Sequence, residues 1–83
     1  MNITYYYVYI LQSENNPGRF YTGHTDNLGN RLKAHNQGKC KNTSKHIPWK
    51  IKTTIAFTDK QKALDFERYL KTSSGRAFAK KRL

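Results

Sequence analysis

The sequence predicts a small α+β domain whose secondary structure elements follow the order β-β-α-β-α-α. Two observations predict this class. Three segments rich in aromatic and β-branched residues have the period of strands, and three segments with helical spacing begin at capping residues. A chain of 83 residues can bury one small core, so we expect a single domain over residues 1–83.

Residues 5–11 form the first predicted strand, and large side chains occupy both of its faces. Tyr5, Tyr7, Tyr9 and Leu11 alternate with Tyr6, Val8 and Ile10. We therefore expect a strand that is buried on both sides. The turn-forming segment 13–19 and the β-prone segment 20–25 complete a predicted hairpin, which would place Tyr9 near Tyr21 on the neighbouring strand.

The first predicted helix begins at a cap formed by Asp26 or Asn27 and ends near Gly38. Its apolar positions Leu28 and Leu32 are four residues apart, which is the spacing of one helical face.

A basic loop over residues 38–48 leads into the third predicted strand, residues 49–57. Alternate positions of this strand are apolar or β-branched, namely Trp49, Ile51, Thr53, Ile55 and Phe57. We expect these side chains to share one buried face. The other face, which carries Lys50 and Lys52, would lie in solvent and discourage pairing with another sheet edge.

Two helices are predicted after the third strand. Thr58 and Gln61 match a capping box, which opens a helix running to about Lys71. A break at residues 73–75 then starts a short final helix, for which Phe78 is the expected apolar anchor.

The charge balance predicts a polyanionic partner. Sixteen Lys and Arg residues against five Asp and Glu residues give a formal net charge of +11. Nucleic acid fits this charge better than a membrane surface does, because no long amphipathic basic helix is predicted. A basic surface that is merely solvated remains the alternative.

The cysteine content and the N-terminal segment indicate the cellular setting. Cys40 is the single cysteine, so neither a disulfide framework within the chain nor a multi-cysteine zinc site can form, and we interpret it as an ordinary loop thiol. Residues 1–7 lack the pattern of a secretory signal, and no apolar stretch approaches the roughly 20 residues of a membrane span. We expect a cytoplasmic protein that does not bind membranes.

One carboxylate is predicted to face the core. At the helical spacing, Glu67 falls inside the apolar arc formed by Ala63, Leu64, Phe66 and Leu70. An unpaired carboxylate is costly to bury, so Glu67 must form an ion pair, be protonated or bind a metal. An ion pair with a Lys or Arg is one hypothesis. A site for one hard cation, completed by water and phosphate oxygens, is the other.

Arg31 and His35 lie four residues apart on the first predicted helix and share a face. A solvated helix surface is the simplest interpretation. A guanidinium can also bind a phosphate at two points and stabilise the charge that develops on a phosphodiester in the transition state. His24 and His46 have no comparable pairing, and we interpret them as surface or nucleic-acid contacts.

Taken together, these segments resemble the GIY-YIG nuclease superfamily, in particular its small free-standing members similar to the catalytic domain of the nucleotide-excision-repair endonuclease. The motifs are, in order, "VYIL" at 8–11, "YTG" at 21–23, "NLGNRL" at 27–32 and a helical glutamate, Glu67. The resemblance covers about residues 5–78. It implies a small three-stranded antiparallel sheet flanked by helices, in agreement with the predicted order of elements.

The resemblance also implies a function, which is a metal-dependent DNA endonuclease that hydrolyses phosphodiester bonds by a one-metal mechanism. The implied catalytic residues are Tyr9, Tyr21, Arg31, His35 and Glu67. Glu67 would be the ligand of a Mg²⁺ or Mn²⁺ ion. Tyr21, with Tyr9 close by, would position or deprotonate the attacking water. Gly23 corresponds to the glycine of the second motif, where the missing side chain leaves room for backbone or substrate.

Basic residues outside these motifs are expected to hold the nucleic-acid backbone without reading sequence. They are Lys39, Lys41, Lys45, Lys50, Lys80, Lys81 and Arg82. DNA is the expected partner, RNA is a second candidate, and a partner protein that supplies targeting is a further expectation.

Three features depart from the family pattern. Tyr7 stands where the first motif often has glycine, Thr22 replaces the isoleucine of the second motif, and no asparagine follows Asn42. Many nucleases of the superfamily have an asparagine in the C-terminal part of the domain. A second hypothesis therefore stays open, in which the chain is a non-catalytic nucleic-acid-binding module that keeps the fold and the basic surface.

Overall fold

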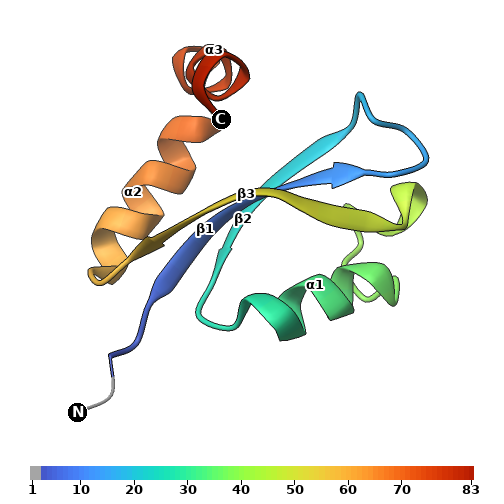
Figure 1. Cartoon of the computed structure of the whole chain (residues 1–83), viewed down its shortest axis with the longest axis horizontal. Helices are drawn as coiled ribbons and strands as arrows, with labels where there is room; N and C mark the ends of the chain where they lie inside the picture. Colours follow the sequence, from blue (N-terminus) through green and yellow to red (C-terminus); the bar gives the residue numbers. More distant parts are fainter. Residues whose placement is uncertain (1–2) are drawn as a thin grey trace.

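The computed structural model describes residues 3–83 and confirms the predicted α+β order. Strands β1 (Tyr6–Ser13), β2 (Phe20–Thr25) and β3 (Trp49–Phe57) form one antiparallel sheet in the order β2-β1-β3. The helices are α1 (Leu28–Asn36), α2 (Lys60–Leu70), α3 (Ser73–Arg82) and the short 3₁₀ helix η1 (Ser44–His46). Figure 1 shows α1 on one face of the sheet and α2 with α3 on the other. Within the described range, no helix is long and apolar enough to cross a membrane.

Strand β1 lies in the middle of the sheet and is buried on both faces, as the sequence predicts. Its alternating side chains enter two separate cores. The core beneath α2 contains Val8, Ile10, Ala63 and Leu70, and the core beneath α1 contains Tyr9, Leu11 and Trp49. Both helical layers are therefore held to the sheet through the same central strand.

The prediction that β3 buries a single face is wrong, because a β-bulge changes the buried face partway along the strand. The pairing with β1 skips Lys52, so that Ile51 and Thr53 oppose consecutive residues of β1. Trp49 and Ile51 consequently pack in the α1 core, whereas Phe57 packs against the α2 core. An extra residue in one strand moves all later side chains to the other face of the sheet.

The boundaries of α1 agree closely with the sequence. Asn27, rather than Asp26, is the N-cap, and its side-chain oxygen accepts a hydrogen bond of 3.1 Å from the backbone N–H of Asn30. The helix ends at Asn36. Gly38 then adopts a φ of 76°, a left-handed conformation that glycine tolerates best, and the chain reverses there.

The starts of α2 and α3 differ from the prediction by a residue or two. Asp59, not Thr58, caps α2, because its carboxylate accepts hydrogen bonds from two backbone N–H groups, including that of Gln61 at 2.9 Å. Thr72 caps α3 through a 3.0 Å bond from the N–H of Gly75. Residues 73–75 are thus the first turn of α3 and not a break before it.

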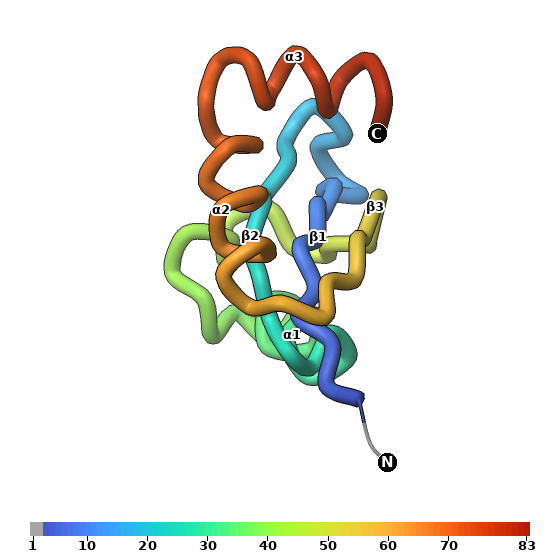
Figure 2. Tube along the Cα trace, turned by 90° about the vertical axis from the view of Figure 1, so that its left-hand side faces the viewer, coloured from blue at the N-terminus to red at the C-terminus, as the bar shows by residue number. Residues whose placement is uncertain are grey.

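Helix α3 packs through small and aliphatic side chains rather than through the predicted anchor. Phe78 is 39% exposed, whereas Ala79 and Leu83 pack against the α2 core. The close approach of α3 to α2 requires Gly75, because a Cβ there would lie 1.9 Å from the carbonyl oxygen of Tyr69. Figure 2 shows the resulting arrangement, in which α3 runs across the end of α2.

The substitution Gly75→Ala is expected to lower the free energy of unfolding by about 2 kcal/mol or more, because the new Cβ would overlap backbone atoms of α2. Gly29→Ala is the matched control in α1. Its Cβ would meet no atom closer than 4.0 Å, so alanine should raise the free energy of unfolding by up to about 1 kcal/mol. Urea denaturation followed by circular dichroism measures both. Equal destabilisation by the two changes would contradict the close approach of α3 to α2.

Candidate active site

Four of the five predicted catalytic residues meet on the α1 face of the sheet. The ring of Tyr21 lies 6.4 Å from that of Tyr9 and 5.0 Å from that of His35, measured between centroids. The guanidinium of Arg31, one helical turn before His35, lies close enough to the phenol of Tyr9 for each group to shift the pKa of the other. Strands β1 and β2 and helix α1 thus contribute to one polar cluster inside an otherwise apolar layer.

Gly23 makes room for the side chain of Tyr9. The two residues are directly opposite in the β1–β2 ladder. A Cβ on Gly23 would lie 2.6 Å from the phenol oxygen of Tyr9 and 2.8 Å from its Cζ atom. The glycine of the second motif therefore leaves space for the side chain of Tyr9, which the sequence prediction of space for backbone or substrate did not identify.

A buried chain of hydrogen bonds holds the phenol of Tyr9. Its O–H lies 2.9 Å from Nε2 of His35, and Nδ1 of His35 lies 2.8 Å from the hydroxyl of Thr43. That hydroxyl donates to the carbonyl of Cys40 at 3.3 Å, so it accepts from Nδ1–H of His35. Nε2 is then free to accept the phenol proton of Tyr9. All three side chains in this chain are at most 1% exposed.

The loop after α1 places Thr43 at the end of this chain. The indole N–H of Trp49 donates to the carbonyl of Thr43 at 2.8 Å. Asn36, the last residue of α1, exchanges two hydrogen bonds with the backbone of Trp49, at 3.0 and 2.6 Å. The end of α1, the loop and the start of β3 are therefore fixed together around His35.

The environment of the cluster keeps both Tyr9 and His35 neutral. Burial lowers the pKa of His35, and the neighbouring positive charge of Arg31 lowers it further. Burial also raises the pKa of Tyr9, an effect that the neighbouring guanidinium of Arg31 only partly opposes. General-base work by a tyrosine requires a lowered pKa, so the raised pKa of Tyr9 suits a hydrogen-bonding role for this residue instead.

Arg31 and Tyr21 are the members of the cluster that a substrate can reach. The guanidinium of Arg31 is exposed, and the neighbouring phenol of Tyr9 raises its pKa, so it is always charged. Tyr21 is half-buried, and within residues 3–83 its phenol makes no hydrogen bond to another protein group. Arg31 can therefore bind an anion, while Tyr21 can bind a water molecule or a substrate oxygen.

Glu67 lies on the opposite face of the sheet from this cluster. Its carboxylate, 13% exposed, is bonded to Nδ1 of His24 and to Nζ of Lys71, the latter at 2.7 Å. Burial disfavours its charge, but the hydrogen bonds from Lys71 and His24 outweigh this and hold the pKa of Glu67 below its usual range. The interpretation of His24 as an unpaired surface residue is therefore wrong.

Strand β2 connects the polar cluster around Tyr9 with the pair formed by His24 and Glu67. Gly23 and His24 are consecutive, so they face opposite sides of the sheet. Gly23 supports Tyr9 on the α1 face, while His24 holds Glu67 on the α2 face. The structure thus brings Tyr9, Tyr21, Arg31 and His35 together, and it places Glu67 beyond the intervening edge strand.

Glu67 can serve as a ligand for a single hydrated cation. Within residues 3–83 there is no group of three or more His, Cys, Asp or Glu side chains that could enclose a metal. One carboxylate with water and substrate oxygens is a common arrangement for Mg²⁺. One carboxylate oxygen is bonded to His24 and the other to Lys71, and the side chain of Lys71 is 52% exposed and able to turn away. The donor set therefore fits a hydrated hard cation that replaces Lys71.

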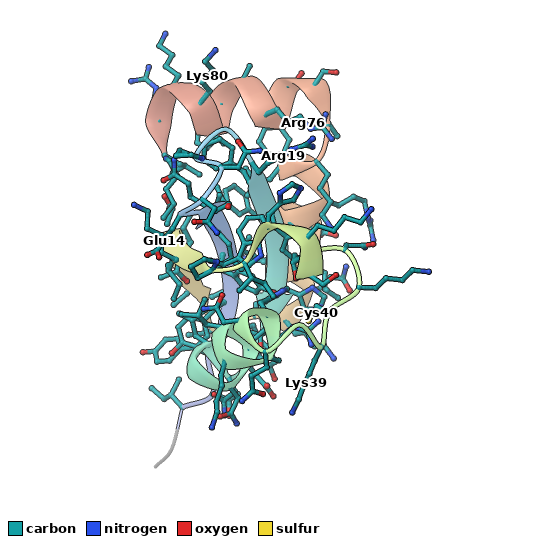
Figure 3. The ribbon with its side chains drawn as sticks, turned by 90° about the vertical axis from the view of Figure 1, so that its right-hand side faces the viewer. Glu14, Arg19, Lys39, Cys40, Arg76 and Lys80 are labelled. Carbon is teal, nitrogen blue, oxygen red and sulfur yellow. The ribbon has the colours of Figure 1, made fainter. Side chains whose placement is uncertain are left out.

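The predicted nucleic-acid-binding residues are all exposed but do not form one surface. They are Lys39, Lys41, Lys45, Lys50, Lys80, Lys81 and Arg82. Lys39 lies beyond the end of α1, whereas Lys80 belongs to α3, and Figure 3 shows the two at opposite ends of the molecule. The excess of positive charge is thus distributed over at least two regions.

Sequence reasoning missed Thr43 and His24. Thr43 lies in a polar loop, where nothing distinguishes it from its neighbours before the fold brings it to His35. His24 stands 43 residues from Glu67. The available signal was the alternation of β2, which places His24 on the face opposite Gly23, where the predicted inward-facing carboxylate needed a partner.

The three-stranded antiparallel sheet with helices on both faces is the fold that the sequence motifs implied. Residues 5–82 match the profile of the GIY-YIG catalytic domain, and the chain belongs to that family.

Relatives and a solved structure agree with this assignment. A UPF0213 protein of Bacillus licheniformis is 36% identical over 75 residues, which cover 89% of this chain and 75% of that protein. The solution NMR structure of a UPF0213 protein from Bacillus halodurans is 35% identical, covers 92% of this chain and 80% of its own, and superposes with a TM-score of 0.55. The structure-specific endonuclease subunit SLX1 of Meyerozyma guilliermondii is 44% identical over 73 residues, which cover 80% of this chain but 24% of that protein.

Protonation of His35 is expected to destabilise the fold. Because the folded-state pKa lies below the usual value near 6.5, the stabilisation is complete above about pH 6.5 and is lost as the pH falls through the folded-state pKa. The free energy of unfolding should fall by up to about 1.4 kcal/mol per pH unit in that window. Urea denaturation between about pH 7.5 and pH 5 measures the decline.

His35→Gln removes this titration, so the free energy of unfolding should change little between about pH 7.5 and pH 5. The control His46→Gln should show the same decline as wild type, because the His46 ring makes no hydrogen bond within the described residues. The same pH dependence in wild type and His35→Gln would show that His35 is not the group responsible.

Proposed function

We propose that the protein is a metal-dependent DNA endonuclease that hydrolyses phosphodiester bonds with one divalent cation, Mg²⁺ or Mn²⁺. The observation that carries this proposal is the position of Arg31, which is exposed to solvent and lies beside the buried phenol of Tyr9. A cation at this surface position is suited to stabilising charge on a phosphate in the transition state. Membership of the GIY-YIG family supports the same reaction class.

Arg31 binds the phosphate that is cleaved. Its planar guanidinium donates to non-bridging oxygens and stabilises the negative charge on pentavalent phosphorus. Tyr9 acts as a positioning residue, because its phenol lies beside the guanidinium of Arg31 and its O–H donates to Nε2 of His35. His35 and Thr43 position Tyr9 in turn. The buried hydrogen bonds among Tyr9, His35 and Thr43 thus fix the ring beside which the exposed guanidinium of Arg31 lies.

Tyr21 orients the attacking water. Its phenol lies beside Tyr9 and His35 and has no other protein partner within residues 3–83, so it can accept a hydrogen bond from water. Attack by this water on phosphorus forms the new P–O bond and breaks the bond to the 3′ oxygen, while the attacking water loses one proton to solvent and the 3′ oxygen takes one up from solvent. The reaction releases a 3′ hydroxyl and a 5′ phosphate.

Glu67 would hold the Mg²⁺ or Mn²⁺ ion, and His24 would orient the Glu67 carboxylate. When bound, such a cation would supply positive charge that stabilises the phosphodiester during cleavage. The low pKa of Glu67 supports this role, because the carboxylate is ionised whenever a cation is available. Release of Lys71 from Glu67 would free the second carboxylate oxygen for the cation.

DNA with a branched or otherwise irregular structure is the substrate that we favour, and RNA is the second candidate. The relative from Meyerozyma guilliermondii is described as a structure-specific endonuclease subunit. Since a subunit acts together with other chains, we extend the proposal to a partner protein that targets this domain to its substrate. The net charge of +11 supplies general attraction to nucleic acid without sequence selection.

Purified protein incubated with supercoiled, single-stranded and branched DNA should cleave at least one of them when Mg²⁺ or Mn²⁺ is present and none in EDTA. Glu67→Ala should abolish cleavage, because the variant lacks the carboxylate that holds the cation. Arg31→Ala should lower the rate about 10²- to 10³-fold, since transition-state charge is no longer stabilised. Gel electrophoresis of end-labelled substrates measures both effects.

Matched controls remove the same charges elsewhere. Asp65→Ala deletes a carboxylate that is 59% exposed on the same helix, and Lys33→Ala deletes a cation of α1. Both should cleave like wild type. Cleavage that survives Glu67→Ala and Arg31→Ala together would overturn the mechanism. Binding of DNA with no metal-dependent cleavage would instead favour the non-catalytic module.

The two tyrosines should differ in the same assay. Tyr21→Phe is expected to slow cleavage on the order of 100-fold with little change in stability, because only the hydrogen bond to water is removed. Tyr9→Phe should lower the free energy of unfolding by about 1–3 kcal/mol, because Nε2 of His35 is left buried without a partner. Rate measurements and urea denaturation of both variants check this. Equal stability losses would argue against the separate roles.

A further inference from the structure

A groove with a cavity volume of about 780 Å³ lies on the α2 and α3 side of the sheet. Its walls come from the β1–β2 hairpin, from β3 and from α3, which are close in Figure 2 although they are far apart in sequence. The catalytic cluster around Tyr9 is on the other face of the sheet. The groove is therefore a separate feature that the proposed chemistry has not used.

The charges around this groove are all positive. Five cationic side chains line it, namely Arg19, Lys52, Lys71, Arg76 and Lys80, and no Asp or Glu does. Within the described part of the chain, Arg19, Arg76 and Lys80 form no ion pair. Figure 3 shows Arg19 and Arg76 close together beneath α3, with Lys80 on the same helix. A concave surface lined by charge of one sign selects a ligand of the opposite sign.

The floor of the groove is apolar and includes an exposed aromatic ring. Ile10, Leu70 and Ala79 contribute aliphatic surface, and Phe20 at the start of β2 is 51% exposed. An exposed aromatic ring beside unpaired cations can contact a ligand that has both a flat apolar part and an anionic part. Nucleotides have both parts, since bases stack on aromatic rings and phosphates bind Lys and Arg.

We infer that this groove binds an unpaired strand of nucleic acid, with its phosphates against Arg19 and Arg76 and a base against Phe20. A duplex keeps its bases stacked inside and cannot present them to Phe20. A cavity of this volume is the size of a site for a small ligand, and it suits a short run of unpaired nucleotides.

The position of Lys71 connects the groove to Glu67. Lys71 lines the groove and also bonds to the carboxylate of Glu67 at 2.7 Å. A single strand that leaves the groove on the Lys71 side would reach the candidate metal ligand. This link between the groove and Glu67 rests on the proposed function. It specifies the substrate as DNA with an unpaired segment next to the bond that is cut. The binding step itself does not depend on cleavage.

The test measures binding in EDTA, where no cleavage occurs, by fluorescence anisotropy of a labelled oligothymidylate and of a duplex of equal length. Wild type should bind the single strand more tightly than the duplex. Arg19→Ala/Arg76→Ala should weaken single-strand binding at least about tenfold and reduce the slope of log affinity against log salt by about 0.7 for each phosphate that the variant no longer binds. Phe20→Ala should weaken binding about fivefold or more without changing that slope.

The control Lys33→Ala/Lys62→Ala removes the same charge from exposed positions outside the groove and should change affinity by less than about threefold. Lys80→Gln, a milder change in the groove, should weaken single-strand binding by a smaller factor. Circular dichroism verifies that each variant is folded. Equal losses in the control and groove variants, tighter binding of duplex, or binding of phosphatidylserine vesicles in preference to the oligonucleotide would each overturn the inference. Absence of cleavage alone would count against the proposed function and leave this binding result intact.

Discussion

The hydrogen bond from Tyr9 to His35 is the interaction on which the rest of the site depends. It joins the central strand to α1 in a fully buried position, where an unpaired imidazole nitrogen or phenol would be costly. Its geometry requires a residue without a side chain at position 23 of β2, and it requires Thr43 to fix the tautomer of His35. Strand β1, helix α1 and the loop that carries Thr43 are therefore joined through the phenol of Tyr9, and the exposed residue Arg31 lies beside that phenol.

Much of the fold and part of the site could be predicted from sequence, for reasons that differ between residues. The strands could be predicted because the alternation of their side chains is a local pattern. Tyr9, Tyr21, Arg31 and His35 could be predicted because they belong to motifs that occur in a fixed order. The change of face in β3 could not be predicted, because a bulge at Lys52 depends on how β3 pairs with β1. The inward position of Glu67 followed from helical spacing, but its partner His24 lies 43 residues away on another element.

Residues with the same functional group have different roles because some are buried and others are exposed. Tyr9 and Tyr21 carry the same phenol, but burial raises the pKa of Tyr9 and commits it to a structural hydrogen bond, while Tyr21 faces the open side of the cluster. Basic residues divide in the same way. Lys71 is bonded to a carboxylate and Lys52 to the carbonyl of Leu83, whereas Arg19 and Arg76 have no ion-pair partner within residues 3–83. The composition reports only their number, and their roles come from the fold.

The bulge in β3 also bears on how the domain unfolds. Because of it, Trp49 enters the core beneath α1 and Phe57 packs against the core beneath α2, so β1 and β3 each belong to both cores. Neither core can open without withdrawing a strand from the other. Native-state fluctuations should therefore be cooperative across the whole sheet rather than confined to one half. The polar cluster around Tyr9 consequently shares the stability of the entire domain, and its preorganisation persists until global unfolding.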